Sequence, residues 1–290
     1  MGLYRSGMLA TAALLIFGAA AVSAQEAAGG EGCSSRMTGG SDESWRLLSP
    51  GLEFRKFRLR FKDGHSSRMS GVRIDQARFN IRLKWQAGRG ASAKAASEIA
   101  RLERAAVAIN AGYFDEKGRP LGYFRTNGKV FNSRLLFRGR RRALHLGAVF
   151  YVRGGRAGIA TREDFDSKGV TEAFQAGPYL VRGGKPDSGL AAYREFRRAD
   201  RRSVLALGKK RRLIFIVSEE IGRGISWCEL QDFLSRSEAA GGLGVAEAMN
   251  LDGGSSSQLY VRGNGRSRNL EGRIVPALIL AIPRGPRGGS

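Results

Sequence analysis

The sequence predicts a single α+β domain with a mixed or antiparallel β-sheet core and a few helices. Three observations support this prediction. Short apolar runs recur along the chain between glycine or charge clusters, as is typical of buried strands. Only two stretches combine helical spacing with capping residues. No internal repeat and no obvious linker divides the chain, so we expect one domain.

The first strands are predicted where cationic and apolar residues alternate, in RKFRLRF (55–61) and RFNIRLKW (78–85), because a period of two buries one face. Arg and Lys on the outer faces would also discourage pairing between sheet edges. In the closing apolar run, Pro276 indicates an edge strand or a strand start, since proline cannot donate to the ladder. The remaining apolar runs that predict strands are 107–110, 146–152, 203–208, 212–218 and 274–282.

Two helices are predicted. The first lies in SAKAASEIARLERAA, where Ser92 or Ser97 is a plausible cap. The second covers 226–241 and opens with a capping box, in which Ser226 is the N-cap and Glu229 follows three positions later.

The chain begins with a short basic segment, an apolar run and the small residues VSA, which predict a cleaved secretory signal over 1–24. A membrane anchor is the weaker alternative, because the apolar run is shorter than the roughly 20 residues that span a bilayer. We expect a flexible leader at 25–50, the folded domain at 51–283 and a frayed tail at 284–290. The mature protein is expected to be periplasmic or secreted, with no transmembrane segment.

The formal net charge of +23 predicts an anionic partner, because a basic excess of this size attracts polyanions over long range. Cell-surface phosphate polymers, acidic polysaccharide and anionic lipid all fit an exported protein. Nucleic acid is not expected, because the secretory signal and the weak base-stacking pattern count against it.

Cysteine and histidine usage limits the chemistry. Cys33 and Cys228 could form one disulfide in an oxidising compartment, and two unpaired thiols are the alternative. His65 and His145 lie far apart in sequence and outside any zinc motif, so both are expected to be structural or surface residues. No serine-nucleophile elbow, P-loop or dinucleotide fingerprint is present. No cofactor is predicted, and a divalent metal ion is left open.

The segment INAGYF is the first candidate for a functional site. Asn110 ends a predicted strand, Gly112 permits a close backbone approach, and Tyr113 or Phe114 could wall a sugar-sized pocket. An ordinary turn between a strand and aromatic core residues is the alternative.

Two further segments repeat the combination of a turn with a strand. In FQAGPYLV, Gly177 and Pro178 shape a turn before an apolar strand. In RRSVLALG, Arg202 and Ser203 stand where a strand begins, and the planar guanidinium binds phosphate bidentately. In so basic a chain, a plain surface arginine is the alternative.

The most specific segment is NLDGGSSSQLYV. Gly253 and Gly254 would free backbone N–H groups around Asp252, and serines such as Ser256 would add donors. Asp252 could then act as a base, a nucleophile or a stabiliser of positive charge. The alternative is a two-residue hairpin, which would not need Asn250 before it or three serines after it.

Taken in order, NAGYF, AGPYLV, RRSVLALG and AMNLDGGSSSQLY resemble the motifs of the phosphodiester glycosidase family over 102–282. The resemblance implies that 51–283 is a phosphodiester glycosidase-like domain. It also implies a hydrolase that cleaves the bond between a sugar and a phosphate in an anionic sugar phosphodiester or envelope glycan. The competing expectation is a non-catalytic envelope protein that binds phosphorylated or acidic glycans.

By matching positions, the resemblance implies that Arg202 and Ser203 grip the phosphate while Asn110 and the Gly253–Gly254 backbone position the sugar. Asp252 would stabilise the oxocarbenium-like transition state or activate water. The sequence does not select a second carboxylate, and its candidates are Asp115, Asp166, Glu219 and Glu220.

Overall fold

The computed structural model describes residues 37–40, 43–86, 93–139, 144–219 and 224–285. These residues belong to one compact unit, Gly32–Ser290. The predicted signal segment and part of the predicted leader lie outside the described residues. In the part of the chain that is described, no helix combines the length and apolarity needed to cross a membrane.

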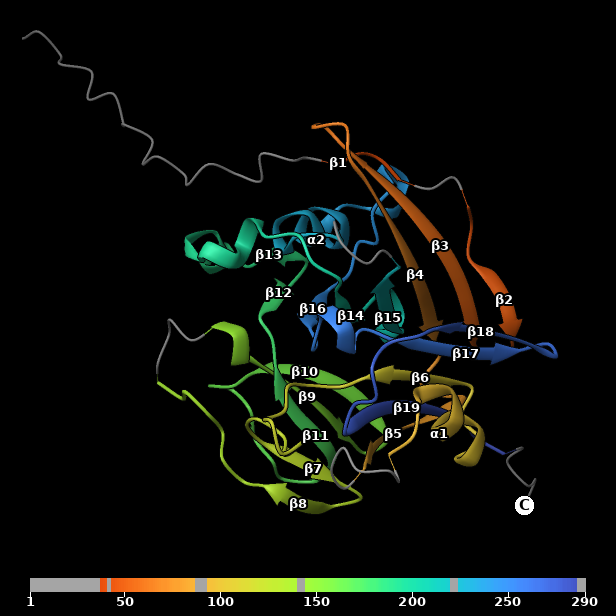
Figure 1. Cartoon of the computed structure of the whole chain (residues 1–290), viewed down its shortest axis with the longest axis vertical. Coiled ribbons are helices and arrows are strands. Elements are labelled where there is room, and N and C mark those ends of the chain that lie inside the picture. The colour runs from red at the N-terminus through yellow and green to blue at the C-terminus, as the bar shows by residue number, and fades with distance from the viewer. Residues whose placement is uncertain (1–36, 41–42, 87–92, 140–143, 220–223, 286–290) are drawn as a thin grey trace, which may run out of the picture. The chain divides into compact units, whose positions relative to one another are not determined.

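The largest sheet has nine strands. They are β1 (Met37–Gly39), β2 (Arg46–Ser49), β3 (Leu52–Phe61), β4 (Ser66–Ile74), β12 (Tyr179–Arg182), β13 (Lys185–Pro186), β14 (Ser203–Leu207), β15 (Leu213–Ser218) and β16 (Glu247–Asn250). Their order is β1-β3-β4-β15-β14-β16-β12-β13, and β2 also pairs with β3 (Figure 1). Two segments of the predicted leader therefore form strands, because Met37 is buried opposite Phe61 and β2 follows the edge of β3.

Two five-stranded sheets complete the fold. The first, in the order β10-β9-β11-β7-β8, consists of β7 (Phe124–Thr126), β8 (Lys129–Asn132), β9 (Ala148–Arg153), β10 (Arg156–Thr161) and β11 (Val170–Ala176). The second, in the order β18-β17-β6-β19-β5, consists of β5 (Phe79–Trp85), β6 (Val107–Asn110), β17 (Leu259–Gly263), β18 (Arg266–Leu270) and β19 (Ala277–Pro283). All strand pairs among the described residues are antiparallel.

The three sheets share one apolar core. Phe215 from the large sheet, Phe150 from the second sheet and Ile279 from the third belong to the same buried cluster. A second cluster lies between the other face of the large sheet and the longer helix, α2 (Trp227–Ser235) (Figure 1). The fold is thus largely β, and the α+β prediction agrees with it at a coarse level.

The helices agree with the sequence in part. The capping box of α2 is present, with Ser226 and Glu229 bonded reciprocally, but the helix ends at Ser235, and Glu238–Ala240 form a separate short turn. The predicted cap of the first helix is wrong. Helix α1 (Ala96–Leu102) starts after Ala95 without a side-chain cap and has Ser97 inside it, while Ser92 lies outside the described residues.

The strand predictions hold with small shifts at the ends. Leu146 belongs to a short 3-10 turn rather than to β9. Pro276 precedes β19, which lies between β6 and β5, so the proline marks a strand start and not an edge. The cationic face predicted on β3 is present, with Lys56, Arg58 and Arg60 exposed.

Candidate active site

Three strand ends meet where the large sheet faces the third sheet. Asn110 is the last residue of β6, Ser203 is the first of β14, and Asn250 is the last of β16. Val204 lies opposite Asn250 in the register of β14 and β16. The Ser203 hydroxyl donates to Asn110 Oδ1 at 2.8 Å and thereby links the two sheets. Segments far apart in sequence are therefore adjacent here.

Asn110 is the centre of this junction and is only 1% exposed. Its Nδ2 donates to the carbonyl of Asp252 at 2.6 Å, and its Oδ1 also accepts from the Gln258 amide at 3.2 Å. The nitrogen and the oxygen of the Asn110 side chain are thus both engaged by protein groups. Asn110 accordingly holds the Asp252 turn and is a positioning residue, and the predicted contact with a sugar is not supported by its burial.

The turn after Asn250 is built from main-chain hydrogen bonds. The Asp252 amide donates to Ala111 O at 3.1 Å, and the Gly254 amide donates to Arg201 O at 2.7 Å. The Gly254 N–H, which was expected to surround a ligand, is therefore used by the fold. The two-residue hairpin alternative is wrong, because β16 and β17 belong to different sheets.

The glycines of this turn allow it to pack against the start of β14. A Cβ on Gly253 would lie 2.8 Å from Arg201 O and 3.9 Å from Nη1 of Arg202. Gly254 has a φ of +58°, a left-handed conformation that favours glycine. The Asp252 side chain, next to this contact, is partly exposed. The structure therefore brings Asp252, Asn110 and Arg202 to one place.

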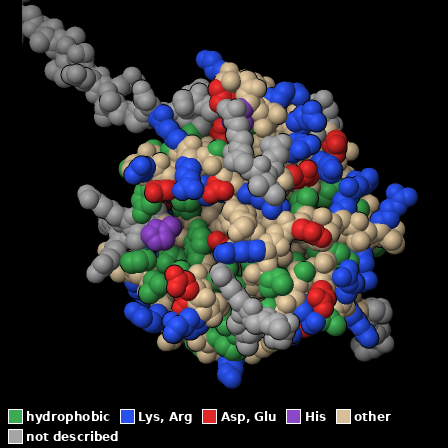
Figure 2. Space-filling view, in the orientation of Figure 1, with side chains coloured by type: hydrophobic (Ala, Val, Ile, Leu, Met, Phe, Trp, Pro, Cys, Tyr) green, Lys and Arg blue, Asp and Glu red, His purple; other side chains and the backbone are tan. Residues whose placement is uncertain are grey.

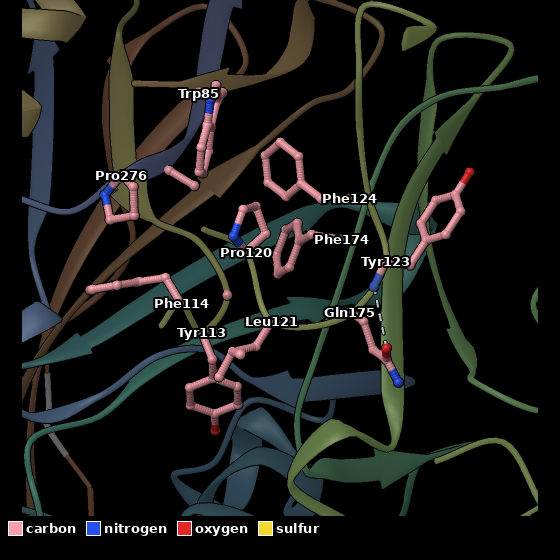
Figure 3. A pocket seen from close by; sticks show the side chains of 12 residues that line it. Trp85, Tyr113, Phe114, Pro120, Leu121, Tyr123, Phe124, Phe174, Gln175 and Pro276 are labelled. Atoms are coloured by element: carbon pink, nitrogen blue, oxygen red, sulfur yellow. Dashed lines mark hydrogen bonds between the residues drawn. The ribbon is translucent and has the colours of Figure 1, made fainter. Parts of the chain in front are cut away.

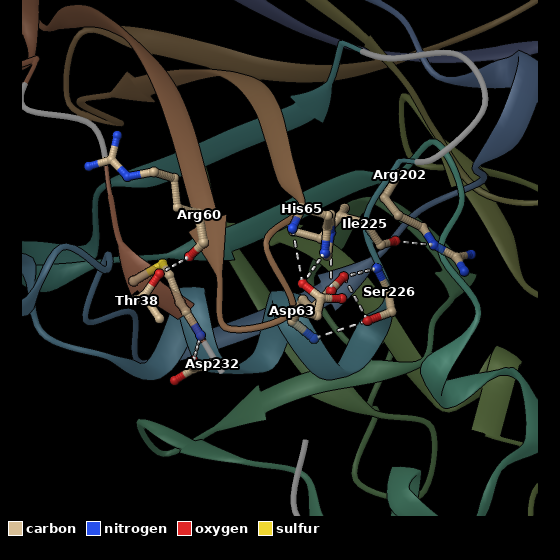
Figure 4. Close-up of polar contacts among 10 residues, drawn as sticks. Thr38, Arg60, Asp63, His65, Arg202, Ile225, Ser226 and Asp232 are labelled. Atoms are coloured by element: carbon tan, nitrogen blue, oxygen red, sulfur yellow. Dashed lines mark hydrogen bonds and ion pairs between the residues drawn. The ribbon is translucent and has the colours of Figure 1, made fainter. Parts of the chain in front are cut away.

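Arg202 is buried, with 8% of its surface exposed, and its side chain is held in a fixed orientation. Its Nε donates to Ile225 O at 3.3 Å (Figure 4), its Nη2 donates to Arg198 O at 2.8 Å, and its guanidinium lies 5.0 Å from the centre of the Trp227 ring. Among the described residues it forms no ion pair, and its Nη1 has no hydrogen-bond partner. Burial lowers the pKa of Arg202, while the negative charge of Asp200 raises it. Because arginine stays protonated, Nη1 provides a positive charge beside the Asp252 turn.

A network centred on the buried side chains of His65 and Glu229 supports the loop that holds Arg202. His65 Nδ1 lies 2.8 Å from Asp63 Oδ1, and its Nε2 lies 3.3 Å from Glu229 Oε1. Glu229 Oε2 in turn accepts from the amide and the hydroxyl of Ser226, the residue after Ile225 (Figure 4). His65 thus has the structural position expected of it, and His145 is exposed.

Tyr113 lies near both Asp252 and Arg202. Its hydroxyl donates to Gly177 O at 2.5 Å and accepts from Asn250 Nδ2 at 3.2 Å. Burial raises the pKa of Tyr113, the charge of Asp252 raises it further, and Arg202 lowers it. The phenol is therefore neutral at physiological pH and close enough to interact with both charges. The residue after Gly177 also contributes, because the Asn250 amide donates to Pro178 O at 2.9 Å.

The aromatic space beside Tyr113 is not a sugar pocket. Figure 3 shows the Tyr113 hydroxyl pointing away from the cluster of rings that includes Phe124 and Phe174. The cavity holds about 10 Å³, which leaves room for one water at most. Gly112 does allow a close approach, but to its own chain, because a Cβ there would lie 2.9 Å from Gln175 O. This cavity is therefore too small to be the predicted sugar-sized pocket.

The two serines expected to bind ligand are buried and engaged. Ser203 is fully buried and donates to Asn110. Ser256 is 1% exposed, and its hydroxyl accepts from Arg273 Nε at 3.2 Å. Both serines hold the junction together.

The four carboxylates named from the sequence have other positions. Asp115 is bonded to Arg119 within its own turn, and Asp166 lies on an exposed loop 3.5 Å from Arg153. Glu219 accepts from the Ser70 hydroxyl at 2.5 Å. Glu220 lies outside the described residues.

Asp200 is a carboxylate of the site that the sequence analysis missed. Its Oδ1 accepts from the Arg201 amide at 2.8 Å and lies 3.9 Å from the position of a Cβ on Gly254. Its charge also acts on Arg202. Its place in ADRRS, two residues before Arg202, was the available signal.

Cys228 is disulfide-bonded, and Cys33, the other cysteine of the sequence, lies outside the described residues. Their pairing stays a prediction. No group of three or more metal-ligating side chains occurs among the described residues.

Replacing Asn110 with Ala is expected to lower the free energy of unfolding by about 3 kcal/mol, because three buried partners would lose their hydrogen bonds. Urea unfolding followed by tryptophan fluorescence measures this change. Asn269→Ala is the matched control and should cost less than about 0.5 kcal/mol, since the exposed Asn269 side chain donates to Glu271 Oε1 at the surface. Equal losses in the two variants would contradict the central position of Asn110.

Comparisons with known proteins place this geometry in context. The model of a family described as phosphodiester glycosidase matches residues 103–281. An uncharacterised protein of Escherichia coli, YigE, is 28% identical over 159 residues, which cover 54% of this chain and 58% of that protein. The chain therefore spans little more than half the length of this relative.

Two solved structures share the fold. The catalytic domain of zebrafish N-acetylglucosamine-1-phosphodiester alpha-N-acetylglucosaminidase, auto-inhibited by its pro-peptide, superposes with a TM-score of 0.60 at 19% identity. That match covers 84% of this chain and 88% of the other. A hypothetical protein from Synechocystis superposes with a TM-score of 0.58 at 17% identity, covering 83% and 64%. At these identities the matches support the fold alone.

Proposed function

The chain belongs to the phosphodiester glycosidase family, and we propose on this basis that it hydrolyses the bond between the anomeric carbon of a sugar and a phosphate. In this reaction the oxygen of water bonds to the anomeric carbon. The bond from that carbon to the phosphate oxygen breaks, and the phosphate oxygen keeps the electron pair. The products are a free sugar and a phosphomonoester.

The observation that supports this proposal most is the free edge of Arg202 beside the Asp252 turn. Two of its nitrogens are held by carbonyls, and Nη1 lies 3.9 Å from the position of a Cβ on Gly253. A phosphate oxygen bound there would be adjacent to Asp252. Phosphate is a good leaving group once its charge is neutralised, so a preorganised cation lowers the barrier directly.

We assign different roles to the other residues. Asp252 faces the sugar and stabilises the positive charge that develops at the anomeric carbon. Tyr113, with its neutral hydroxyl, and Asn250 shape the floor between Asp252 and the Gly177–Pro178 turn. Asn110 and Ser203 keep the two sheets in register beneath the site.

Asp200 supplies the second carboxylate in this proposal. A base near Arg202 and the Asp252 turn can take the proton of the attacking water. Asp200→Asn is expected to lower kcat for a sugar 1-phosphodiester by about a hundredfold, because an amide cannot accept that proton. Asn retains an oxygen for the Arg201 amide, so the melting temperature should stay unchanged.

The control for this prediction is Asp166→Asn, which removes an exposed carboxylate away from the junction and should leave kcat unchanged. Added azide should restore turnover of the Asp200→Asn variant as glycosyl azide. If Asp200→Asn keeps full activity and the pH profile of the wild type, Asp200 is not the second carboxylate.

The function itself is tested by release of reducing sugar and phosphomonoester from a panel of sugar 1-phosphodiesters incubated with purified protein. Turnover that depends on Asp252 supports a hydrolase. Saturable binding of the same compounds without turnover would instead support a glycan-binding envelope protein.

We also propose that the protein acts outside the cytoplasm on an anionic envelope glycan. The signal-like segment and the net charge of +23 support this setting. Cationic side chains are spread over the face seen in Figure 2 rather than gathered in one patch. N-terminal sequencing of the protein recovered from the cell envelope, with a start at residue 25, would support the proposal.

A further inference from the structure

A second groove lies at the opposite end of β14 and β15 from Arg202. It is formed where the turns after β4, β9 and β14 meet the segment after β19, so all three sheets contribute to it. Its volume is about 540 Å³. The lining residues that carry the argument are Gln76, Gly154, Arg156, Lys210, Arg211 and Arg284.

The groove concentrates positive charge. Arg156, Lys210, Arg211 and Arg284 are all exposed, and within the described part of the chain none of them forms an ion pair with a carboxylate. The one carboxylate in the lining, Asp75, accepts from the Ala77 amide of its own turn. Four cations from three segments therefore face one space that a single carboxylate shares, and this excess of positive charge favours the binding of an anion.

The turn that carries Lys210 and Arg211 is held in a backbone conformation that is unfavourable for residues with a Cβ. Lys210 and Arg211 have φ values of +53° and +55°, in the left-handed region that residues with a Cβ rarely adopt. The buried side chain of Gln76 fixes this turn by donating to Arg211 O at 2.5 Å and accepting from the Ala157 amide at 2.6 Å. The buried Gln76 amide thus links the turn of Lys210 and Arg211 to the residue after Arg156.

The opposite wall leaves the main chain open to a ligand. A Cβ on Gly154 would meet no atom within 4 Å. Arg284 is placed by its own amide, which donates to Arg78 O at 2.9 Å, and its Nη2 approaches Gly155 O at 3.4 Å. An anion in the groove can therefore meet glycine backbone and guanidinium groups together, a combination suited to phosphate.

We propose that this groove binds a phosphate group, free or attached to a sugar, at a site separate from the candidate active site. The five residues of β14, at about 3.3 Å each, separate the two sites by roughly 15 Å, so one phosphate cannot occupy both. A polymer with repeated phosphates could occupy them together, with the groove retaining the chain while the other site acts on it.

The test is a titration of the intact protein with inorganic pyrophosphate at constant ionic strength, followed by amide resonances in two-dimensional NMR. Gly154 and Gly155 report on the groove, and Gly253 and Gly254 report on the candidate active site in the same sample. A parallel titration with glucose 1-phosphate is compared with the pyrophosphate titration. The compound with the lower dissociation constant shows whether the groove prefers an inorganic phosphate or a sugar phosphate.

Two double variants remove the groove's charge in different ways. Arg156→Gln/Arg284→Gln and Lys210→Asn/Arg211→Asn should each weaken pyrophosphate binding at Gly154 by about tenfold or more. Asn tolerates the left-handed conformation, so the second variant keeps the turn. Arg58→Gln/Arg60→Gln removes the same charge from the exposed face of β3 and should change affinity by less than about twofold.

The proposal is supported if the Gly154 and Gly155 resonances saturate and only the groove variants weaken this binding by about tenfold or more. It is overturned if these resonances do not respond, or if the β3 control weakens binding as much as the groove variants do. Neither result depends on hydrolytic activity. The proposal of phosphate binding in the groove can therefore be overturned while the proposed hydrolase function stands, and the hydrolase function can be overturned while phosphate binding in the groove stands.

Discussion

Asp252→Asn is expected to lower kcat for a sugar 1-phosphodiester by about a thousandfold while the protein remains folded. The main-chain groups of Asp252 hold the turn, since its amide donates to Ala111 O and its carbonyl accepts from Asn110. The substitution leaves these groups in place and removes only the negative charge. Loss of activity would therefore report on the carboxylate and not on the fold.

Initial rates of reducing-sugar release, with the melting temperature of each variant, measure this effect. Asp166→Asn serves again as the control, because it removes a carboxylate of the same kind from an exposed loop. A small fall in kcat for Asp252→Asn, comparable to that of the control, would mean that the carboxylate has no part in the chemistry.

Arg202→Lys is expected to lower kcat/KM by about a hundredfold or more, mainly through a weaker grip on the phosphate. The guanidinium donates to Ile225 O and Arg198 O and stacks on Trp227, and these three contacts direct its remaining nitrogen towards the turn. A lysine ammonium cannot make these contacts and still reach a phosphate. Inhibition by inorganic phosphate should weaken in parallel with kcat/KM.

The neighbouring Arg201 provides the matched control. It is equally buried, but its side-chain donors bond to Ser218 O and Glu271 O. Arg201→Lys should reduce stability and change kcat/KM by less than about threefold. If both substitutions lower kcat/KM equally, the loss reflects general disruption of the strand and Arg202 has no specific role.

The sequence predicted the strands well because each shows either a period of two or a continuous apolar run. The alternation in 55–61 corresponds to the buried and exposed faces of β3, and the apolar runs at 203–208 and 212–218 correspond to two central strands of the large sheet. The start of the first helix was harder to place. Ser92 or Ser97 was predicted as its cap, but the helix begins after Ala95, which has no side chain that can cap it. The division into three sheets has no local signal, because it depends on pairings between distant strands.

The site residues were predictable where the local sequence around a residue is distinctive. They were less predictable where the role of a residue depends on a partner that is distant in sequence. Asp252 and Arg202 stand out in their segments, and the structure brings those segments together. Whether Asn110 and Ser203 face a ligand or each other depends on how the sheets pack, and they face each other. Asp200 was missed because its importance comes from the approach of Gly254, which lies far away in sequence.

The most direct test of the account is a crystal structure of the Asp252→Asn variant with an uncleaved sugar 1-phosphodiester. We predict phosphate oxygens within hydrogen-bonding distance of Arg202 Nη1, and the anomeric carbon about 3.5 Å from the side chain at position 252. A ligand bound elsewhere, with its phosphate away from Arg202, would contradict the shared site on which the proposed function rests.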